Sequence, residues 1–317
     1  MKRSHEKRPP GQRYRAGPSN RLALDRMFDR VVRGALEVKP PEVLYHYTTW
    51  TGVKGILSSQ RFWATAHDCT NDEAELVSAD SVIIDAVNGL RQNSVGAAAE
   101  VLDLFIENYA REQVTLVIPV YLACFSVLQD DEEQWKRYGD NGAGICLGIR
   151  MLKELPPEDP ALGSALIKVD YSESSWRQKV KANMGKVCAI LGRARTLPNN
   201  KKLGLSALYR IAAFASIMAK QPRWEVEQEY RHVTIVHPDA RIEPKERYSE
   251  GRTIRYLPIL VREEGKRIAF AEVIIGPNQD IEGARTRLKE ILANNRYRVG
   301  DIEYPAISTS ALAPWHL

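Results

Sequence analysis

The order of strand-like and helical segments constrains the fold of this 317-residue chain more than any other sequence feature. Helical periodicity is concentrated in two long blocks, residues 75–111 and 175–220, whereas apolar strand-like runs lie before, between and after them. A doubly wound parallel sheet would instead alternate strands and helices along the chain. The order therefore predicts an α+β fold around a mixed or antiparallel sheet, with residues 21–317 in a single domain.

Strands are predicted at residues 43–48, 61–65, 114–127, 144–149, 165–171, 226–236, 256–261, 268–275 and 302–307. Helices are predicted at residues 21–36, 52–59, 75–111 (two stripes), 130–138, 175–195, 203–220 and 281–294. Residues 1–20 are basic, contain proline and glycine, and have almost no large aliphatic side chains, which predicts a disordered arm.

The composition is that of an ordinary soluble protein, with 44% hydrophobic and 27% charged residues. The four cysteines have no paired spacing, so we expect reduced thiols and neither a disulfide framework nor a zinc site. No apolar run reaches membrane-spanning length, and the first residues lack the apolar core of a secretory signal. These features predict a cytoplasmic protein without a membrane partner.

Positive charge is concentrated in one segment of the chain. Residues 174–224 contain 11 Lys or Arg and no Asp or Glu, so the rest of the chain must carry −6 to reach the total of +5. A local basic field attracts polyanions, and we therefore expect a basic helical insertion at about 174–224 that binds nucleic acid. The alternative is a helical hairpin with a solvated lysine face.

Several polar side chains occur where strands begin or end. His46 and Tyr47 alternate on the strand at 43–48, with His46 on its apolar face, where a histidine is more often a core residue than a catalyst. Ser126 ends another strand, and Trp135 and Tyr138 are three residues apart on a short helix. These aromatic side chains either fill the core or form the wall of a pocket for a flat ligand.

The most informative polar motif is a run of glutamates at the start of the strand at 226–236. Alternation places Glu227 and Glu229 on the side that carries Val233, which is apolar further along. If both carboxylates face a cleft, their proximity raises the pKa of one of them. Alternatively, Arg231 pairs with Glu229. Asn71, Asp72 and Glu75 belong to a predicted helix start, where Thr70 and Glu73 form a capping box or Asn71 or Asp72 is the cap instead.

These motifs in their order resemble the bacterial domain-of-unknown-function 2971 family, to which no activity is attached. The resemblance extends from about residue 44 to 277 and rests on His46-Tyr47-Thr48, Asn71-Asp72 with Glu75, Phe125-Ser126, Trp135 with Tyr138 and Gly144, Glu227 to Arg231, and Ile275-Gly276-Pro277.

The same order is similar, more distantly, to the ADP-ribosyltransferase fold. That resemblance implies an enzyme that uses NAD as a substrate and has a role as a bacterial toxin or phage-defence effector. The basic segment favours a macromolecular acceptor such as nucleic acid. The resemblance also implies that His46 holds a ribose hydroxyl, that Ser126 supports the site, and that Tyr138 or Trp135 stacks on nicotinamide. Glu229 would contact the reacting ribose and Glu227 the acceptor. Here Cys124 stands where that fold usually has a second serine or threonine.

Two other functions fit the sequence. A non-enzymatic nucleic-acid-binding or sensing module would use the basic segment and leave His46 and Glu229 structural. A metal-dependent hydrolase would use Asp72, Glu75, Glu227 and Glu229, although the chain has no His-x-x-x-His or comparable ligand spacing. The sequence leaves the acceptor and the oligomeric state undetermined.

Overall fold

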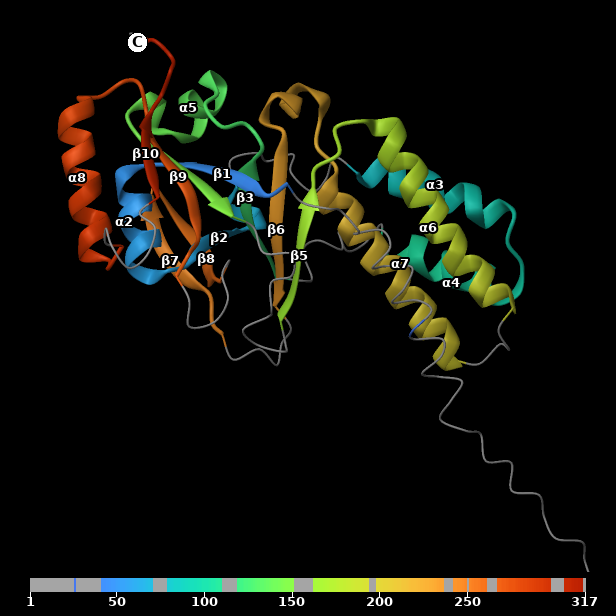
Figure 1. Cartoon of the computed structure of the whole chain (residues 1–317). Helices are drawn as coiled ribbons and strands as arrows, with labels where there is room; N and C mark the ends of the chain where they lie inside the picture. Colours follow the sequence, from blue (N-terminus) through green and yellow to red (C-terminus); the bar gives the residue numbers. More distant parts are fainter. Residues whose placement is uncertain are drawn as a thin grey trace, which may run out of the picture.

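The computed structural model describes residues 26, 41–70, 79–109, 119–150, 162–193, 198–236, 242–249, 251–260, 267–297 and 305–315. The predicted arm at 1–20, nearly all of the helix at 21–36, and the motif residues Asn71, Asp72 and Glu75 lie outside these ranges. In the described part, a large sheet and a bundle of helices lie side by side (Figure 1). The α+β prediction is confirmed.

Ten strands form one mixed sheet: β1 Val43–Thr48, β2 Phe62–Ala66, β3 Val120–Ser126, β4 Ile145–Arg150, β5 Leu162–Lys168, β6 Glu229–Val236, β7 Lys245–Ser249, β8 Arg252–Ile259, β9 Phe270–Ile275 and β10 Ala306–Thr309. The strand order is β10-β9-β4-β1-β3-β2-β8-β7, and β6 pairs with β3 and β5. β10 runs parallel to β9, whereas the remaining pairs between these strands are antiparallel. The sheet is therefore branched.

The branch point is β3. One edge of this strand pairs with β6 from Val120 to Ser126. The other edge pairs with β2 at Tyr121 and Leu122 and with β1 at Ser126, which lies opposite Tyr45. Between these two contacts β1 and β2 diverge, so the sheet forks beside the middle of β3. Such a fork interrupts the regular ladder of backbone hydrogen bonds, and side chains can occupy the space between the two diverging strands.

The helices are α2 Trp50–Ser59, α3 Asp80–Gln92, α4 Gly96–Tyr109, α5 Glu132–Tyr138, α6 Glu173–Arg193, α7 Pro198–Met218 and α8 Ile281–Asn294, with short 3-10 helices η1 His67–Cys69, η3 Asp140–Gly142 and η4 Pro222–Glu227. Helices α3, α4, α6 and α7 form the bundle, and their apolar side chains share one buried core (Figure 1). The predicted basic helices are thus confirmed as helices, and they pack on the block predicted at 75–111. None of the helices in the described ranges combines the length and apolarity that a membrane span requires.

The two faces of the sheet are covered differently. Apolar side chains of α2 and α8 pack on the face that carries Phe125 and Tyr230. On the opposite face, the end of α7 packs on Leu122 and Val233, and Trp135 of α5 packs on Tyr47. This second face, partly covered by two separate helices, is the one that carries Glu229.

Sequence reasoning misplaced the start of one strand and missed another. The strand predicted at 226–236 begins only at Glu229, because Pro222 starts a 3-10 helix and Gln228 adopts a left-handed conformation with φ 45°. β7, which forms an antiparallel pair with β8, was not predicted, because its residues Lys245–Ser249 are too polar to show a buried face. The predictions at 43–48, 144–149 and 268–275 match β1, β4 and β9 to within two residues.

Candidate functional site

Solvent reaches the middle of the sheet at Cys124. This residue is exposed although it lies in β3, whose other residues are all buried. Cys124 lies opposite Arg231 of β6, and Ser126 lies opposite Glu229, so these side chains share the face that α7 and α5 cover only in part. The exposed thiol therefore marks an opening between the end of α7 and helix α5.

A buried cluster of four charges lies beside this opening. The Lys220 ammonium, just after α7, donates to Glu227 Oε2 at 2.6 Å and to Glu229 Oε2 at 2.9 Å. The Arg231 guanidinium donates through Nε to Glu229 Oε1 at 2.8 Å and through Nη2 to Oε2 at 3.2 Å. All four residues are at least nine-tenths buried. Two cations and two carboxylates therefore neutralise each other away from water.

The cluster keeps Glu229 ionised. Burial alone raises the pKa of a carboxyl group, but Arg231 and Lys220 outweigh it and hold the pKa of Glu229 at about 2. A hydrogen bond from the Cys124 thiol acts in the same direction. The pKa of Glu229 is thus lowered, because Lys220 lies between the two carboxylates that the sequence places close together.

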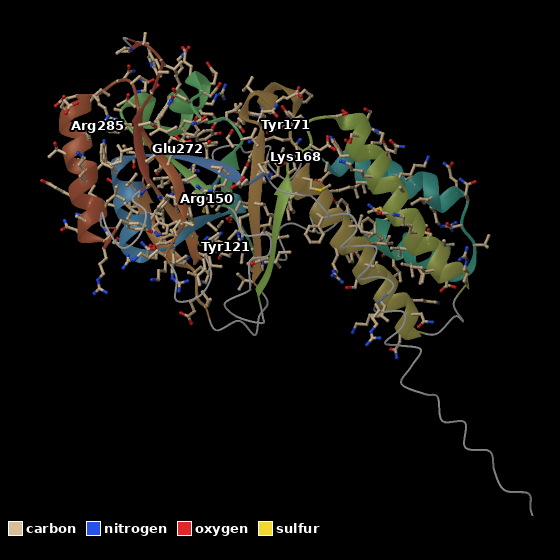
Figure 2. All side chains as sticks on the ribbon, in the orientation of Figure 1. Tyr121, Arg150, Lys168, Tyr171, Glu272 and Arg285 are labelled. Carbon is tan, nitrogen blue, oxygen red and sulfur yellow. The ribbon has the colours of Figure 1, made fainter. Side chains whose placement is uncertain are left out.

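Glu227 reaches the cluster from η4 and not from a strand. Its backbone carbonyl accepts hydrogen bonds from Ser126 Oγ at 2.7 Å and from Gln134 Nε2 at 3.2 Å. The left-handed Gln228 then leads into β6, whose first backbone N–H, that of Glu229, donates to the Tyr171 hydroxyl at 2.9 Å. Tyr171 lies where the sheet meets the helical bundle (Figure 2). Ser126 is 3% exposed and positions the backbone of Glu227.

Tyr138 connects the cluster to solvent. Its hydroxyl donates to Glu227 Oε1 at 2.5 Å, while the residue as a whole is 39% exposed. Burial of the hydroxyl and the negative charge of Glu227 raise the pKa of Tyr138. The buried hydroxyl thus anchors the side chain, while part of the ring stays exposed at the surface. This arrangement suits a side chain that contacts a ligand.

Trp135 and Tyr47 are part of the core. Trp135 is fully buried, its indole Nε1 donates to Asp130 Oδ1 at 2.7 Å, and its ring packs edge-on against Tyr47 at 4.9 Å between centroids. The Tyr47 hydroxyl donates to the Leu128 carbonyl at 2.8 Å. Of the two aromatic side chains expected to compete for a stacking role, Tyr138 is the one that ligand can reach.

His46 lies on the opposite face of the sheet from Glu229. Its ring packs against Phe62 and Phe125, at 5.1 and 5.6 Å between centroids. Its Nδ1 lies 2.9 Å from the Cys124 carbonyl and must donate the hydrogen, since a carbonyl only accepts. Burial lowers the pKa of His46. The structure therefore places His46 in the fork between β1 and β3 and does not bring it together with Glu227 and Glu229.

Cations gather at the rim of the opening around Trp224 of η4. Lys220 Nζ lies 5.3 Å from its ring centroid, and the guanidinium carbons of Arg137 and Arg223 lie at 4.9 and 5.4 Å. Arg137 also pairs with Glu133 at 3.3 Å. Arg223 has no ion pair with any residue in the described ranges, so one exposed guanidinium at the rim is available to an anion.

The positive charge of the basic helices is partly compensated within the bundle. Helices α6 and α7 carry +7 in formal charge, and α3 and α4 carry −4, which leaves +3. Arg177 pairs with Asp85 at 3.1 Å, and Lys201 pairs with Glu100. The basic field expected from residues 174–224 is weaker than the sequence suggests, because acidic helices distant in sequence pack against them. Binding of nucleic acid by this segment stays a prediction.

Sequence reasoning missed Lys220 and Tyr171 and gave Cys124 no role in the site. Lys220 is the last residue of the helix predicted at 203–220, and its position seven and nine residues before the two glutamates was the available signal. No group of three His, Cys, Asp or Glu within the described ranges is suited to hold a metal ion. Asp72 and Glu75 lie outside those ranges, so the metal-dependent alternative stays a prediction.

Comparison with known families supports one of the two resemblances. The family described as Protein of unknown function (DUF2971) matches residues 134–232. This range contains α5 from Gln134 onward, the glycine turn, both basic helices and both glutamates of the charge cluster, and the resemblance to this family is confirmed there. No curated protein and no solved structure matches the chain. The ADP-ribosyltransferase resemblance therefore rests on the motifs alone.

Proposed function

We propose that the chain is an NAD-dependent, ADP-ribosyltransferase-like enzyme that works on a macromolecular acceptor. The observation that supports this best is the placement of Tyr138, whose partly exposed ring is anchored through its hydroxyl to the buried Glu227. A flat leaving group that stacks on this ring lies beside the two carboxylates, which suits chemistry at a sugar that develops positive charge.

In the proposed reaction, the bond between the ribose C1′ and the nicotinamide ring nitrogen breaks, and its electron pair leaves with nicotinamide. A nucleophile of the acceptor forms the new bond to C1′ and gives up a proton, for which Glu227 is the proposed base. The fixed negative charge of Glu229 stabilises the oxocarbenium-like sugar in the transition state. A preorganised group of this kind contributes on the order of 100- to 1,000-fold in rate.

Glu229 fits this role only if substrate changes its contacts. Both of its oxygens are occupied, and the residue is 4% exposed. Arg231 holds it through two hydrogen bonds, whereas Lys220 makes a single contact with it at 2.9 Å. A ribose hydroxyl that takes the place of Lys220 on Oε2 would leave the carboxylate ionised through Arg231. In this proposal Lys220 then remains on Glu227.

Phosphate groups of the substrate would lie at the rim. Arg223 and Arg137 flank Trp224 next to Tyr138, and guanidinium groups bind phosphate through paired N–H donors. This rim, together with the exposed cations of the bundle, is also the proposed contact with a nucleic-acid acceptor. In this proposal His46, Trp135, Tyr47 and Ser126 shape the site and do not contact the substrate.

The test is nicotinamide release from NAD by the wild type and by Tyr138 variants. Substitution of Glu229 is unsuitable, because it would leave Arg231 buried without its partner and unfold the protein for reasons unrelated to catalysis. Tyr138→Ala removes the ring and Tyr138→Phe removes only the hydroxyl. Tyr248→Ala is the matched control, since Tyr248 is 78% exposed on β7.

We expect Tyr138→Ala to weaken NAD turnover about 10- to 100-fold, the usual value of one aromatic stacking contact. Tyr138→Phe keeps the ring and should lose less, and Tyr248→Ala should behave as the wild type. A wild-type protein that neither binds NAD nor releases nicotinamide would refute the proposal. Equal effects of Tyr138→Ala and Tyr248→Ala would refute the role of the ring.

A further inference from the structure

A second hollow lies beyond the end of α5, apart from the charge cluster. Its volume is about 540 Å³, within the range of small-molecule sites. Three segments remote in sequence line it, namely the turn after α5, the turn after β9 and the C-terminal segment, which in Figure 1 runs from β10 toward α5. The lining residues are Asp140, Asn141, Ala143, Pro277, Asn278, Gln279, Pro314 and Trp315.

The wall next to α5 has an unusual backbone. Asp140, Asn141 and Gly142 follow one another in the left-handed region, with φ 52°, 49° and 84°. For a residue other than glycine this conformation costs of order 1–3 kcal/mol and persists where the surroundings impose it, often at ligand sites. Here Asn278 and Trp315 impose it, because Asn278 Nδ2 donates to the Asn141 carbonyl at 2.9 Å and Trp315 Nε1 donates to Asn141 Oδ1 at 3.3 Å.

Most polar groups of the hollow are already used. The Asn278 oxygen accepts from the Trp315 backbone at 2.9 Å, and both ends of the Gln279 amide are bonded, to Trp50 Nε1 and to the Gly144 carbonyl. In contrast, the Asp140 carboxylate and Asn141 Nδ2 have no hydrogen-bond partner among the residues that the structure describes. Two acceptor oxygens and one N–H₂ donor on adjacent residues thus remain available to a ligand.

The remaining lining is largely apolar and includes an indole. Pro277, Pro314 and Ala143 offer no hydrogen bonds from their side chains, and Trp315 contributes an indole ring whose Nε1 is bonded to Asn141 and whose centroid lies 5.8 Å from the Lys136 ammonium. A planar heterocycle with an apolar face and a polar edge is complementary to such a site. Among common heterocycles, guanine presents two parallel N–H donors that match one carboxylate, with a carbonyl beside them that accepts from an amide.

We propose that this hollow binds a purine base, with guanine in preference to adenine, through Asp140, Asn141 and Trp315. Adenine has fewer N–H donors side by side on one edge than guanine has. One oxygen of the Asp140 carboxylate would therefore lack a donor. The proposal does not depend on the NAD chemistry proposed above, because it concerns binding by other residues and is measured without turnover.

The test is isothermal titration of the full chain with GMP, AMP and ribose 5-phosphate. Asp140→Asn is the decisive variant, because asparagine also tolerates the left-handed conformation, and the change removes the charge and replaces one acceptor oxygen by an NH₂ donor. Glu290→Gln on α8 is the matched control, since Glu290 is exposed and lies outside the hollow. Trp315→Leu tests the contact with the ring.

We expect GMP to bind about tenfold more tightly than AMP and ribose 5-phosphate not to bind. Asp140→Asn should weaken GMP binding about 10- to 100-fold, the usual effect of losing hydrogen bonds to a charged group, while Glu290→Gln should leave it unchanged. The proposal is overturned if GMP gives no heat, if Asp140→Asn binds GMP as the wild type does, or if AMP equals GMP. A wild-type protein that binds GMP as expected but does not turn over NAD would refute only the proposed function.

Discussion

The most direct test of the buried charge cluster is to replace Lys220 by methionine, which has a similar length and no charge. Glu229 would keep both hydrogen bonds from Arg231. Glu227 would lose its 2.6 Å contact with the ammonium and keep only the Tyr138 hydroxyl. The substitution therefore leaves one buried carboxylate without a cation.

Breaking a buried ion pair in this way costs about 3–5 kcal/mol. We expect a loss of about 3 kcal/mol in the free energy of unfolding, at the lower end, because Glu229 stays paired and the methionine side chain adds apolar burial. Urea unfolding at pH 7 measures it. Lys202→Met on the exposed side of α7 is the control and should change stability by less than about 0.5 kcal/mol.

A second substitution separates the charge effect from a packing effect. In Lys220→Met with Glu227→Gln, no buried charge lacks a partner, so the double variant should be more stable than Lys220→Met alone. If instead both variants are equally destabilised, the cost arises from packing around Lys220. If Lys220→Met is as stable as Lys202→Met, the reasoning about the cluster is refuted.

The remaining predictions concern pH and glycine. The pKa of Glu229 is lowered from 4.5 to about 2, so its stabilising contribution of about 3 kcal/mol is present above pH 4.5 and is lost as the pH falls toward 2. Burial lowers the pKa of His232 from 6.5 to about 4, so protonation destabilises the fold between pH 6.5 and 4. Unfolding free energy followed against pH should show both steps, and His232→Leu should reduce the upper one, to which the buried His46, whose pKa is also lowered, contributes as well. Gly144→Ala should cost about 3 kcal/mol in urea unfolding, because a methyl group would lie 2.4 Å from the Thr48 carbonyl oxygen, whereas Gly89→Ala has open space in α3 and should gain about 1 kcal/mol. A flat pH profile, or equal effects of the two alanines, would contradict these assignments.

The sequence was most informative where one residue pattern decides the local structure. Alternation in β1 predicted that His46 and Tyr47 lie on opposite faces, and the contacts of their rings, with Phe125 and with Trp135 respectively, agree with it. Helical periodicity located both ends of α6 and the C-terminal end of α7 to within one helical turn. Alternation failed for the backbone at Glu227, which belongs to η4, because a proline-initiated 3-10 helix replaces the start of the predicted strand.

The candidate site was predicted in part. The glutamates at 227 and 229 stood out because carboxylates before an apolar strand need a partner or a cleft, and Tyr138 was singled out beside them. Sequence spacing offered no way to separate Tyr138 from Trp135, since both lie on one helical face. Only packing buries Trp135 completely and leaves the Tyr138 ring 39% exposed.

The sequence by itself determined the α+β class, the helical nature of the basic segment and the presence of two unusual carboxylates, because each depends on neighbours along the chain. The tertiary structure decided which charges meet. Lys220 joins Glu227 and Glu229, and acidic helices from before residue 110 compensate the lysines after residue 174. Electrostatic interaction depends on distance in space and on exclusion of water, and neither is a property of the order of residues.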